Sequence, residues 1–180
     1  MSFGFSGVLL RSTGMRWDLR KSFPYEIYSN INFKVPFSIN GDCYDRYLLR
    51  IEELRQSNKI ILQTLNNISL GEIKIDNYKI VPPVRKQMKN LMESLIQHFK
   101  FYSTGFTISK GSTYIGIEAP KGEFGVFLMT NNSETPYRCK IRAPGFMHLQ
   151  AMNYMCKGHL IADVVTIIGT LDIVFGEVDR

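Results

Sequence analysis

Apolar residues recur at spacings of three and four in a first long stretch, which predicts a helix from residue 42 to about residue 66. Asp42 is a plausible N-cap for this helix. Glu52, Glu53 and Arg55 are expected on its outer face. The apolar positions are Tyr44, Tyr47, Leu48, Ile51, Leu54, Ile61 and Leu65.

A second helix is predicted after Pro82 and Pro83, because proline is tolerated in the first turn of a helix. Its apolar stripe runs to Phe99, and residues 68–81 are expected to form a linker before it. We interpret the stripe as core packing. Its members are Val84, Met88, Leu91, Met92, Leu95, Ile96 and Phe99.

Three strand-like runs follow, at Ser112–Ala119, Glu123–Thr130 and Tyr137–Arg142. They are separated by Pro120-Lys121-Gly122 and Asn131-Asn132-Ser133, which have the composition of tight turns. This pattern predicts a small antiparallel meander of three strands.

The rest of the chain predicts two short helices, at 146–156 and 159–168, and an extended apolar tail at 171–180. Residues 1–40 are punctuated by glycine and proline and are expected to be an irregular, extended lead-in. The fold class is therefore α+β, and we expect residues 1–180 to form a single piece.

Composition narrows the class of protein. Hydrophobic residues make up 44% of the 180 residues, and the net charge is +6. The basic residues are spread over several predicted elements, so we expect solvated faces and interface ion pairs, with no nucleic acid as a partner. The most apolar run, Leu160–Gly169, is interrupted by Asp163 and is too short to span a bilayer.

The sequence has no metal-binding pattern. It contains three cysteines, three histidines and no C-x-x-C motif, so neither a disulfide framework nor a zinc site is expected. His98, His148 and His159 are interpreted as structural. Without a nucleotide-binding or hydrolase motif, reasoning from composition and spacing ends at a basic α+β domain that has no self-contained active site.

Several motifs carry a specific resemblance. The run Glu118-Ala119-Pro120-Lys121-Gly122-Glu123-Phe124-Gly125-Val126 resembles the quinone-site subunit of respiratory complex I. So do the runs Pro136–Phe146, Gly41–Tyr47 and Lys157–Arg180. The resemblance covers about residues 7–180 and implies the C-terminal half of that subunit, which is related to the large subunit of nickel–iron hydrogenases.

The tail departs from the hydrogenase pattern in a way that bears on chemistry. Hydrogenases close their metal site with Asp-Pro-Cys-x-x-Cys-x-x-His, whereas this chain has Asp172, Val174, Glu177 and Arg180 at the Asp, Cys, Cys and His places. Valine and glutamate cannot supply the thiolate pair that nickel requires. In complex I the corresponding cavity takes the quinone headgroup.

The resemblance therefore implies that the tail forms part of a quinone-cavity wall. Val174 and Phe175 would contact the ring, and Arg180 would close the site. Asp172 and Glu177 would tune proton affinity or hold arginines, with structural ion pairs as the alternative for both. The tail is expected to be buried against partners, with basic residues of those partners beside its carboxylates. The chain itself is not expected to carry catalytic or metal-binding residues.

The implied function is that of a core fragment of the proton-pumping NADH:ubiquinone oxidoreductase, a translocase of the electron transport chain. This complex would lie in the mitochondrial inner membrane. This chain would lie in its matrix-facing peripheral arm. Ubiquinone would be the substrate of the complex, while iron–sulfur clusters, FMN and NAD would be bound by other subunits. Implied partners are the complementary N-terminal half, the subunit that carries the terminal iron–sulfur cluster, and other matrix-arm and membrane-arm subunits.

The family's subunit is roughly twice as long as this chain, and its N-terminal half carries a histidine and a tyrosine thought to contact the quinone. An initiating Met1 favours a split gene over a truncated chain. The alternative function is a purely structural element that completes the fold. The two long apolar stripes need partners beyond one small sheet, so the chain is not expected to be stable alone.

Overall fold

The computed structural model describes residues 2–75, 77 and 80–179, which form two compact units. Unit 1 comprises the described parts of Met1–Ile68, Ile115–Val126 and Ile141–Arg180. Unit 2 comprises the described parts of Ser69–Tyr114 and Phe127–Lys140. Residues 1–180, which the sequence predicted to form a single piece, are thus organised as two units. No helix among the described residues is both long and apolar enough to cross a membrane.

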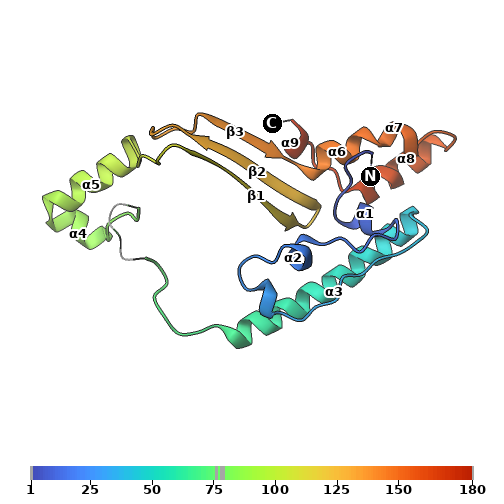
Figure 1. The fold of residues 1–180 in the computed structure, drawn as a ribbon, viewed down its shortest axis with the longest axis horizontal. Helices are drawn as coiled ribbons and strands as arrows, with labels where there is room; N and C mark the ends of the chain where they lie inside the picture. The colour runs from blue at the N-terminus through green and yellow to red at the C-terminus, as the bar shows by residue number, and fades with distance from the viewer. Residues whose placement is uncertain (1, 76, 78–79, 180) are drawn as a thin grey trace. The chain divides into compact units, whose positions relative to one another are not determined.

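The predicted antiparallel meander is confirmed. Strands β1 (Gly111–Ala119), β2 (Gly122–Thr130) and β3 (Arg138–Arg142) form one sheet in the order β1-β2-β3 (Figure 1). The turn between β1 and β2 uses Gly122 at a φ of 140°, which is a conformation that side chains with a Cβ rarely adopt. The strand bounds differ from the predicted ones by at most one residue.

The lead-in is mainly irregular but contains three short helical segments. These are α1 (Val8–Arg11), α2 (Leu19–Ser22) and the 3₁₀ helix η1 (Tyr28–Asn30). The segment around α1 is fully buried in unit 1, where Leu9 packs with Ile167 and Leu171 in a hydrophobic cluster. The lead-in therefore supplies part of the core.

Helix α3 (Cys43–Asn67) confirms the first predicted helix and its cap, because the Asp42 side chain accepts a hydrogen bond of 2.7 Å from the Asp45 amide. Its burial is the reverse of the usual amphipathic arrangement. The buried residues of α3 are Asp45, Arg46, Leu49 and Gln56. Most of the predicted apolar stripe is exposed, including Tyr44, Tyr47, Leu48, Leu54, Ile61 and Leu65.

The second predicted helix is divided. Unit 2 contains α4 (Arg85–Asn90) and α5 (Met92–Ser103), with Leu91 extended at φ −122° and ψ 125° between them. The extended backbone at Leu91 interrupts the ladder of helical hydrogen bonds. Neither helix has a buried residue, so the prediction that this stripe packs in a core is wrong for the residues described here.

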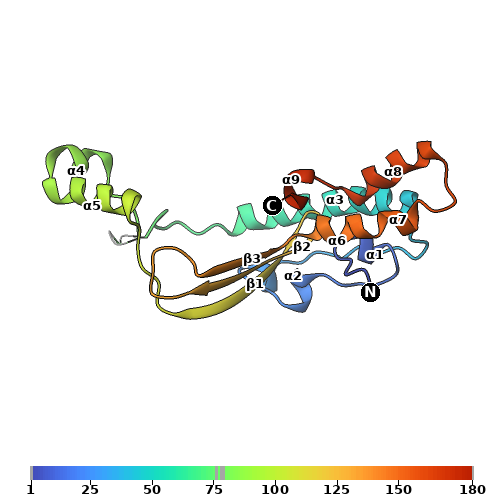
Figure 2. The ribbon, with the colours of Figure 1, turned by 90° about the horizontal axis from the view of Figure 1, so that it is seen from above.

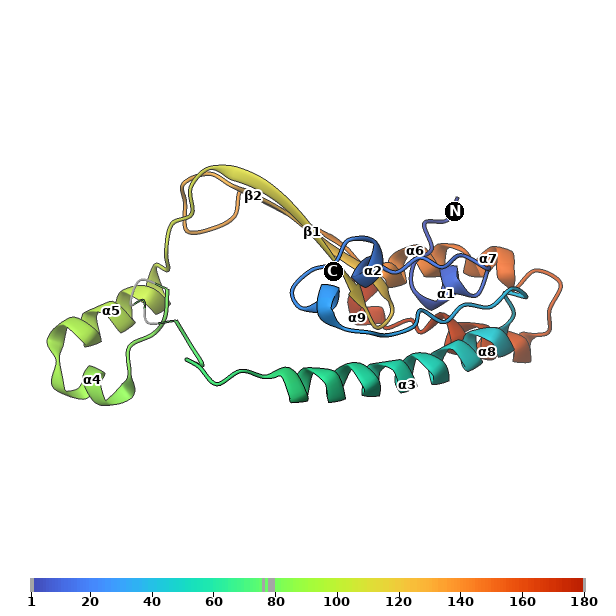
Figure 3. The same ribbon diagram turned by 60° about the horizontal axis from the view of Figure 1, so that its bottom comes forward.

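The last part of unit 1 is more helical than predicted. It forms α6 (Pro144–Gln150), α7 (Met152–Met155), α8 (Ile161–Leu171) and α9 (Phe175–Val178). Helix α8 contacts α3, α6 and α7, while α9 contacts α6 (Figures 2 and 3). The prediction of a wholly extended tail is corrected, because α8 continues through Leu171 and the tail then forms a further helical turn.

Candidate functional site

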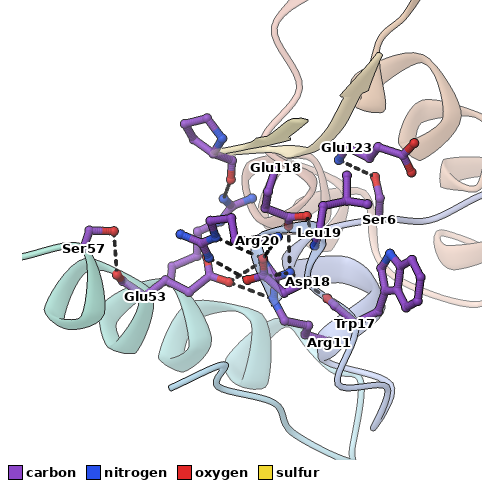
Figure 4. Close-up of polar contacts among 12 residues, drawn as sticks. Ser6, Arg11, Trp17, Asp18, Leu19, Arg20, Glu53, Ser57, Glu118 and Glu123 are labelled. Carbon is purple, nitrogen blue, oxygen red and sulfur yellow. Dashed lines mark hydrogen bonds and ion pairs between the residues drawn. The ribbon is translucent and has the colours of Figure 1, made fainter. Parts of the chain in front are cut away.

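Unit 1 contains an ionic cluster that consists of Arg11, Asp18, Arg20, Glu53 and Glu118 (Figure 4). The Arg11 guanidinium donates to Glu53 Oε1 from Nη2 at 2.6 Å and to Glu118 Oε1 from Nη1 at 2.8 Å. Arg20 holds both carboxylate oxygens of Asp18, at 3.0 and 2.6 Å. The side chains of Arg11, Asp18 and Glu118 are each at most 4% exposed.

Four separate elements bring these side chains together. Arg11 ends α1, Asp18 caps α2, Glu53 lies on α3, and Glu118 lies near the end of β1. Burial raises the pKa of Glu118, although the neighbouring Arg11 opposes this shift. Burial alone would lower the pKa of Arg11, but the carboxylates around it raise the pKa instead. The sequence placed Glu53 on the outer face of its helix, and this prediction is corrected.

A cavity of about 430 Å³ adjoins the ionic cluster. Its lining includes Tyr28, Arg50, Ser57 and Pro120, in addition to members of the cluster. Arg50 also connects this cavity to the tail, because its guanidinium forms an ion pair with Asp172.

Asp172 has basic partners within the chain itself. Arg50 Nη2 lies 3.3 Å from Asp172 Oδ2, and Lys121 Nζ lies 3.6 Å from Asp172 Oδ1. Lys121 also donates a hydrogen bond of 3.0 Å to the Asp172 carbonyl oxygen. The sequence predicted basic residues of partner chains beside the carboxylates of the tail, and at Asp172 the structure has Arg50 and Lys121 of the chain itself.

A second carboxylate of the tail, that of Glu177, contacts the backbone of α6. Glu177 Oε1 accepts a hydrogen bond of 2.8 Å from the Gly145 amide, near the start of α6. Between Asp172 and Glu177, the side chains of Val174 and Phe175 are 52% and 61% exposed. The fifth predicted site residue, Arg180, lies outside the described residues.

His148 on α6 is completely buried in unit 1. Neither ring nitrogen meets the geometry of a hydrogen bond, and the ring packs edge-on against Phe5. Burial lowers the pKa of His148 from 6.5 to about 4, with a further contribution from the charges of Arg50 and Arg142. The imidazole is therefore neutral at pH 7, in keeping with the structural role predicted for it.

Sequence reasoning missed the ionic cluster and Arg50. Their ion pairs join residues that are far apart along the chain, such as Arg11 with Glu118 and Arg50 with Asp172. The local spacing of residues in the sequence cannot predict such a pair. Within the described ranges, no group of three or more His, Cys, Asp and Glu side chains is arranged to hold a metal ion.

Comparison with known proteins identifies the family. The model of the family described as respiratory-chain NADH dehydrogenase, 49 kDa subunit, matches residues 1–180. The chain is 59% identical over 180 residues to the NADH-ubiquinone oxidoreductase 49 kDa subunit of Prototheca wickerhamii and 60% identical over 180 residues to that of Reclinomonas americana. It is 61% identical over 178 residues to NADH dehydrogenase (ubiquinone) iron-sulfur protein 2 of Arabidopsis thaliana.

These alignments cover 99–100% of this chain but only 45–46% of each relative, so the chain spans less than half the length of the curated relatives it matches. The fold and the site define an α+β protein with a buried ionic cluster and an anchored tail that presents apolar side chains. The chain belongs to the family of 49 kDa subunits of respiratory-chain NADH dehydrogenase. This confirms the resemblance at the level of the family, while the position of the chain within the subunit stays a prediction.

Proposed function

We propose that this chain is part of the core subunit of NADH:ubiquinone oxidoreductase and that its tail, residues 171–180, forms part of the wall of the quinone-reduction site. Electrons would reach the quinone from the terminal iron–sulfur cluster of a neighbouring subunit, and FMN and NAD would be bound by other subunits. The complex would lie in the mitochondrial inner membrane, with this chain in the matrix-facing arm.

One observation carries the assignment of the tail. Val174 and Phe175 are more than half exposed although both are apolar, and they lie between two anchored carboxylates. Neighbouring exposed apolar side chains on an anchored segment offer a surface for contact with another molecule. The flat face of a quinone ring fits this pair, while Asp172 and Glu177 keep the backbone on either side in place.

The test is the substitution Val174→Met in the assembled enzyme. A longer side chain at this position reduces the space for the ring, so the KM for ubiquinone should rise while the amount of assembled enzyme stays unchanged. Electron transfer from NADH to an artificial acceptor that bypasses the quinone should also stay unchanged, because that path ends before the quinone site.

Val165→Met on α8 is the matched control, since Val165 is a valine of the same unit that is 73% exposed and lies outside the tail. This variant should leave the quinone kinetics unchanged. If Val174→Met gave the same KM for ubiquinone as Val165→Met in fully assembled enzyme, the placement of the tail at the quinone site would be wrong.

A second candidate function is that of an assembly element, with quinone chemistry carried wholly by the rest of the subunit. The exposed apolar residues of α3 favour it, because a long row of such residues usually marks a protein interface. Under this candidate, Val174→Met would reduce the amount of assembled enzyme and leave the KM of the remaining enzyme unchanged. The proposed partners are the remaining part of the subunit, the cluster-bearing subunit and other subunits of both arms.

A further inference from the structure

We propose that Arg50 is a positioning residue for quinone binding: its guanidinium joins α3 and the β1–β2 turn to the tail and fixes where Val174 and Phe175 lie. This inference rests on the proposed function of the tail. It adds a residue that does not touch the quinone but decides how well the tail can bind it.

Three segments that are distant in the sequence meet at this guanidinium. Arg50 projects from α3, donates a hydrogen bond of 2.9 Å from Nη1 to the Pro120 carbonyl oxygen in the β1–β2 turn, and contacts Asp172 Oδ2 from Nη2 at 3.3 Å. The guanidinium is planar and rigid, so binding two partners at once also fixes their relative position. A lysine ammonium cannot reproduce this geometry, although it keeps the charge.

Asp172 is the point where the chain changes direction. It ends α8 in the left-handed conformation, at φ 55° and ψ 49°, which is uncommon for a residue other than glycine. Leu171, just before it, is completely buried, and Val174, two residues after it, is exposed. A small rotation at Asp172 would therefore move the apolar side chains that follow.

The magnitude of the interaction favours positioning over stability. The side chains of Arg50 and Asp172 are 26% and 41% exposed, and an ion pair of this exposure contributes little to folding because water screens it. Helix α3 is held independently, because Glu53 pairs with Arg11 and Arg46 donates to Thr170 Oγ1 at 3.1 Å. Removing the Arg50 guanidinium should therefore leave unit 1 folded and loosen the tail at Asp172, where Lys121 remains the other basic partner.

The experiment compares Arg50→Met and Arg50→Lys in the assembled enzyme. Arg50→Met should raise the KM for ubiquinone by about three- to fivefold with kcat changed less than about twofold, a range that matches an interaction of this size. Arg50→Lys should give an intermediate KM. Arg55→Met is the control, because Arg55 lies on the same helix with a side chain that is 71% exposed and should leave both parameters unchanged.

A double-mutant cycle with Asp172→Asn separates positioning from a general loss of structure. If Arg50 acts through Asp172, the double variant should raise the KM by less than the two single changes combined, because Asp172→Asn also removes the ion pair with Lys121. Additive effects, an unchanged KM in Arg50→Met, or a loss confined to kcat would overturn the inference. If Arg50→Met does not assemble, Arg50→Lys and its cycle with Asp172→Asn decide the question.

The outcome remains distinguishable from failure of the proposed function. If Val174→Met changes the KM for ubiquinone and the Arg50 variants do not, the tail contacts the quinone but Arg50 does not position it. If neither Val174→Met nor any Arg50 variant changes the KM in assembled enzyme, both the proposed function of the tail and this inference fail.

Discussion

The interior of unit 1 buries charged side chains beside its hydrophobic cluster, whereas its surface exposes many apolar side chains. The interior holds Arg11, Asp18, Glu118 and His148, each at most 4% exposed. The surface carries apolar side chains of α3, together with those of the tail. In an ordinary globular domain, charged residues are rarely buried and large exposed apolar patches mark sites of interaction.

This difference separates the groups that stabilise unit 1 from the groups that are available for contact with other molecules. The ionic cluster joins four elements with hydrogen-bonded charge pairs, and such buried groups affect folding strongly when one partner is removed. The exposed apolar side chains are covered only in part by the described residues. Changes in the interior should therefore reduce the stability of the chain, while changes on the surface should act on assembly or quinone binding.

The largest effect is expected for Arg11→Met. This change removes the guanidinium that pairs with Glu53 and Glu118, and leaves the carboxylate of Glu118 buried without its counter-charge. Breaking a buried charge pair in this way costs about 3–5 kcal/mol of the free energy of unfolding. The midpoint of thermal inactivation and the amount of this chain in the assembled enzyme should both fall sharply.

Arg55→Met tests whether the effect depends on burial. Arg55 pairs with Glu52 on the surface, with side chains that are 71% and 40% exposed, so its loss should be hardly measurable. Equal losses of stability in the Arg11 and Arg55 variants would contradict the distinction between interior and surface.

The second effect is a dependence of stability on pH through His148. The unfolded chain protonates this residue below about pH 6.5, whereas the folded chain does so only below about pH 4. The unfolded state thus binds more protons between these values, and the free energy of unfolding should fall as the pH drops from about 6.5 to about 4. The shift corresponds to about 3 kcal/mol.

The measurement is the unfolding midpoint against pH for the wild type and His148→Phe. The variant replaces the buried imidazole by an aromatic ring that cannot be protonated, so it should lose this part of the acid destabilisation. Glu118 acts in the opposite direction because its pKa is raised, and the difference between the two proteins cancels its contribution. Parallel pH profiles would show that His148 does not titrate as described.

Local signals in the sequence predicted local structure well. The Asp42 cap and the turns of the meander depend on residues within a few positions of one another, so they could be read without the fold. The pair of Arg11 with Glu118 depends on the fold, since 107 residues separate the two. The periodicity of α3 correctly located an apolar face, but periodicity does not tell whether the surface that covers this face belongs to the same chain.

The third effect should be small in stability and large in assembly. Ile61 lies on the exposed stripe of α3 at 54% exposure, and Ile61→Asn removes apolar surface that unit 1 buries only in part. The free energy of unfolding of unit 1 should change by less than about 1 kcal/mol, while incorporation of the chain into the complex should decrease.

The amount of this chain recovered with the other subunits measures this effect. Lys59→Asn, two residues earlier on the same helix, is the control because it changes an exposed polar position. If both variants assembled as the wild type does, the exposed stripe of α3 would not be an interface.

The smallest effect on stability is expected for Gly145→Ala, which tests the second anchor of the tail. A Cβ at this position would lie 3.1 Å from Glu177 Oε1 and 3.2 Å from Glu177 Cδ, so the carboxylate has to move by a few tenths of an ångström. Alanine is favoured over glycine within a helix by about 1 kcal/mol, which offsets a weakened hydrogen bond between the Gly145 amide and Glu177. The midpoint of unfolding should therefore hardly change. The KM for ubiquinone should rise by about two- to threefold, because α9 shifts with Glu177 and one weakened hydrogen bond has an effect of about this size.

Gly169→Ala on α8 is the matched control, since no atom lies within 4 Å of the Cβ that it would add. A KM that changed equally in both variants would mean that helix propensity, and not the position of Glu177, controls the tail.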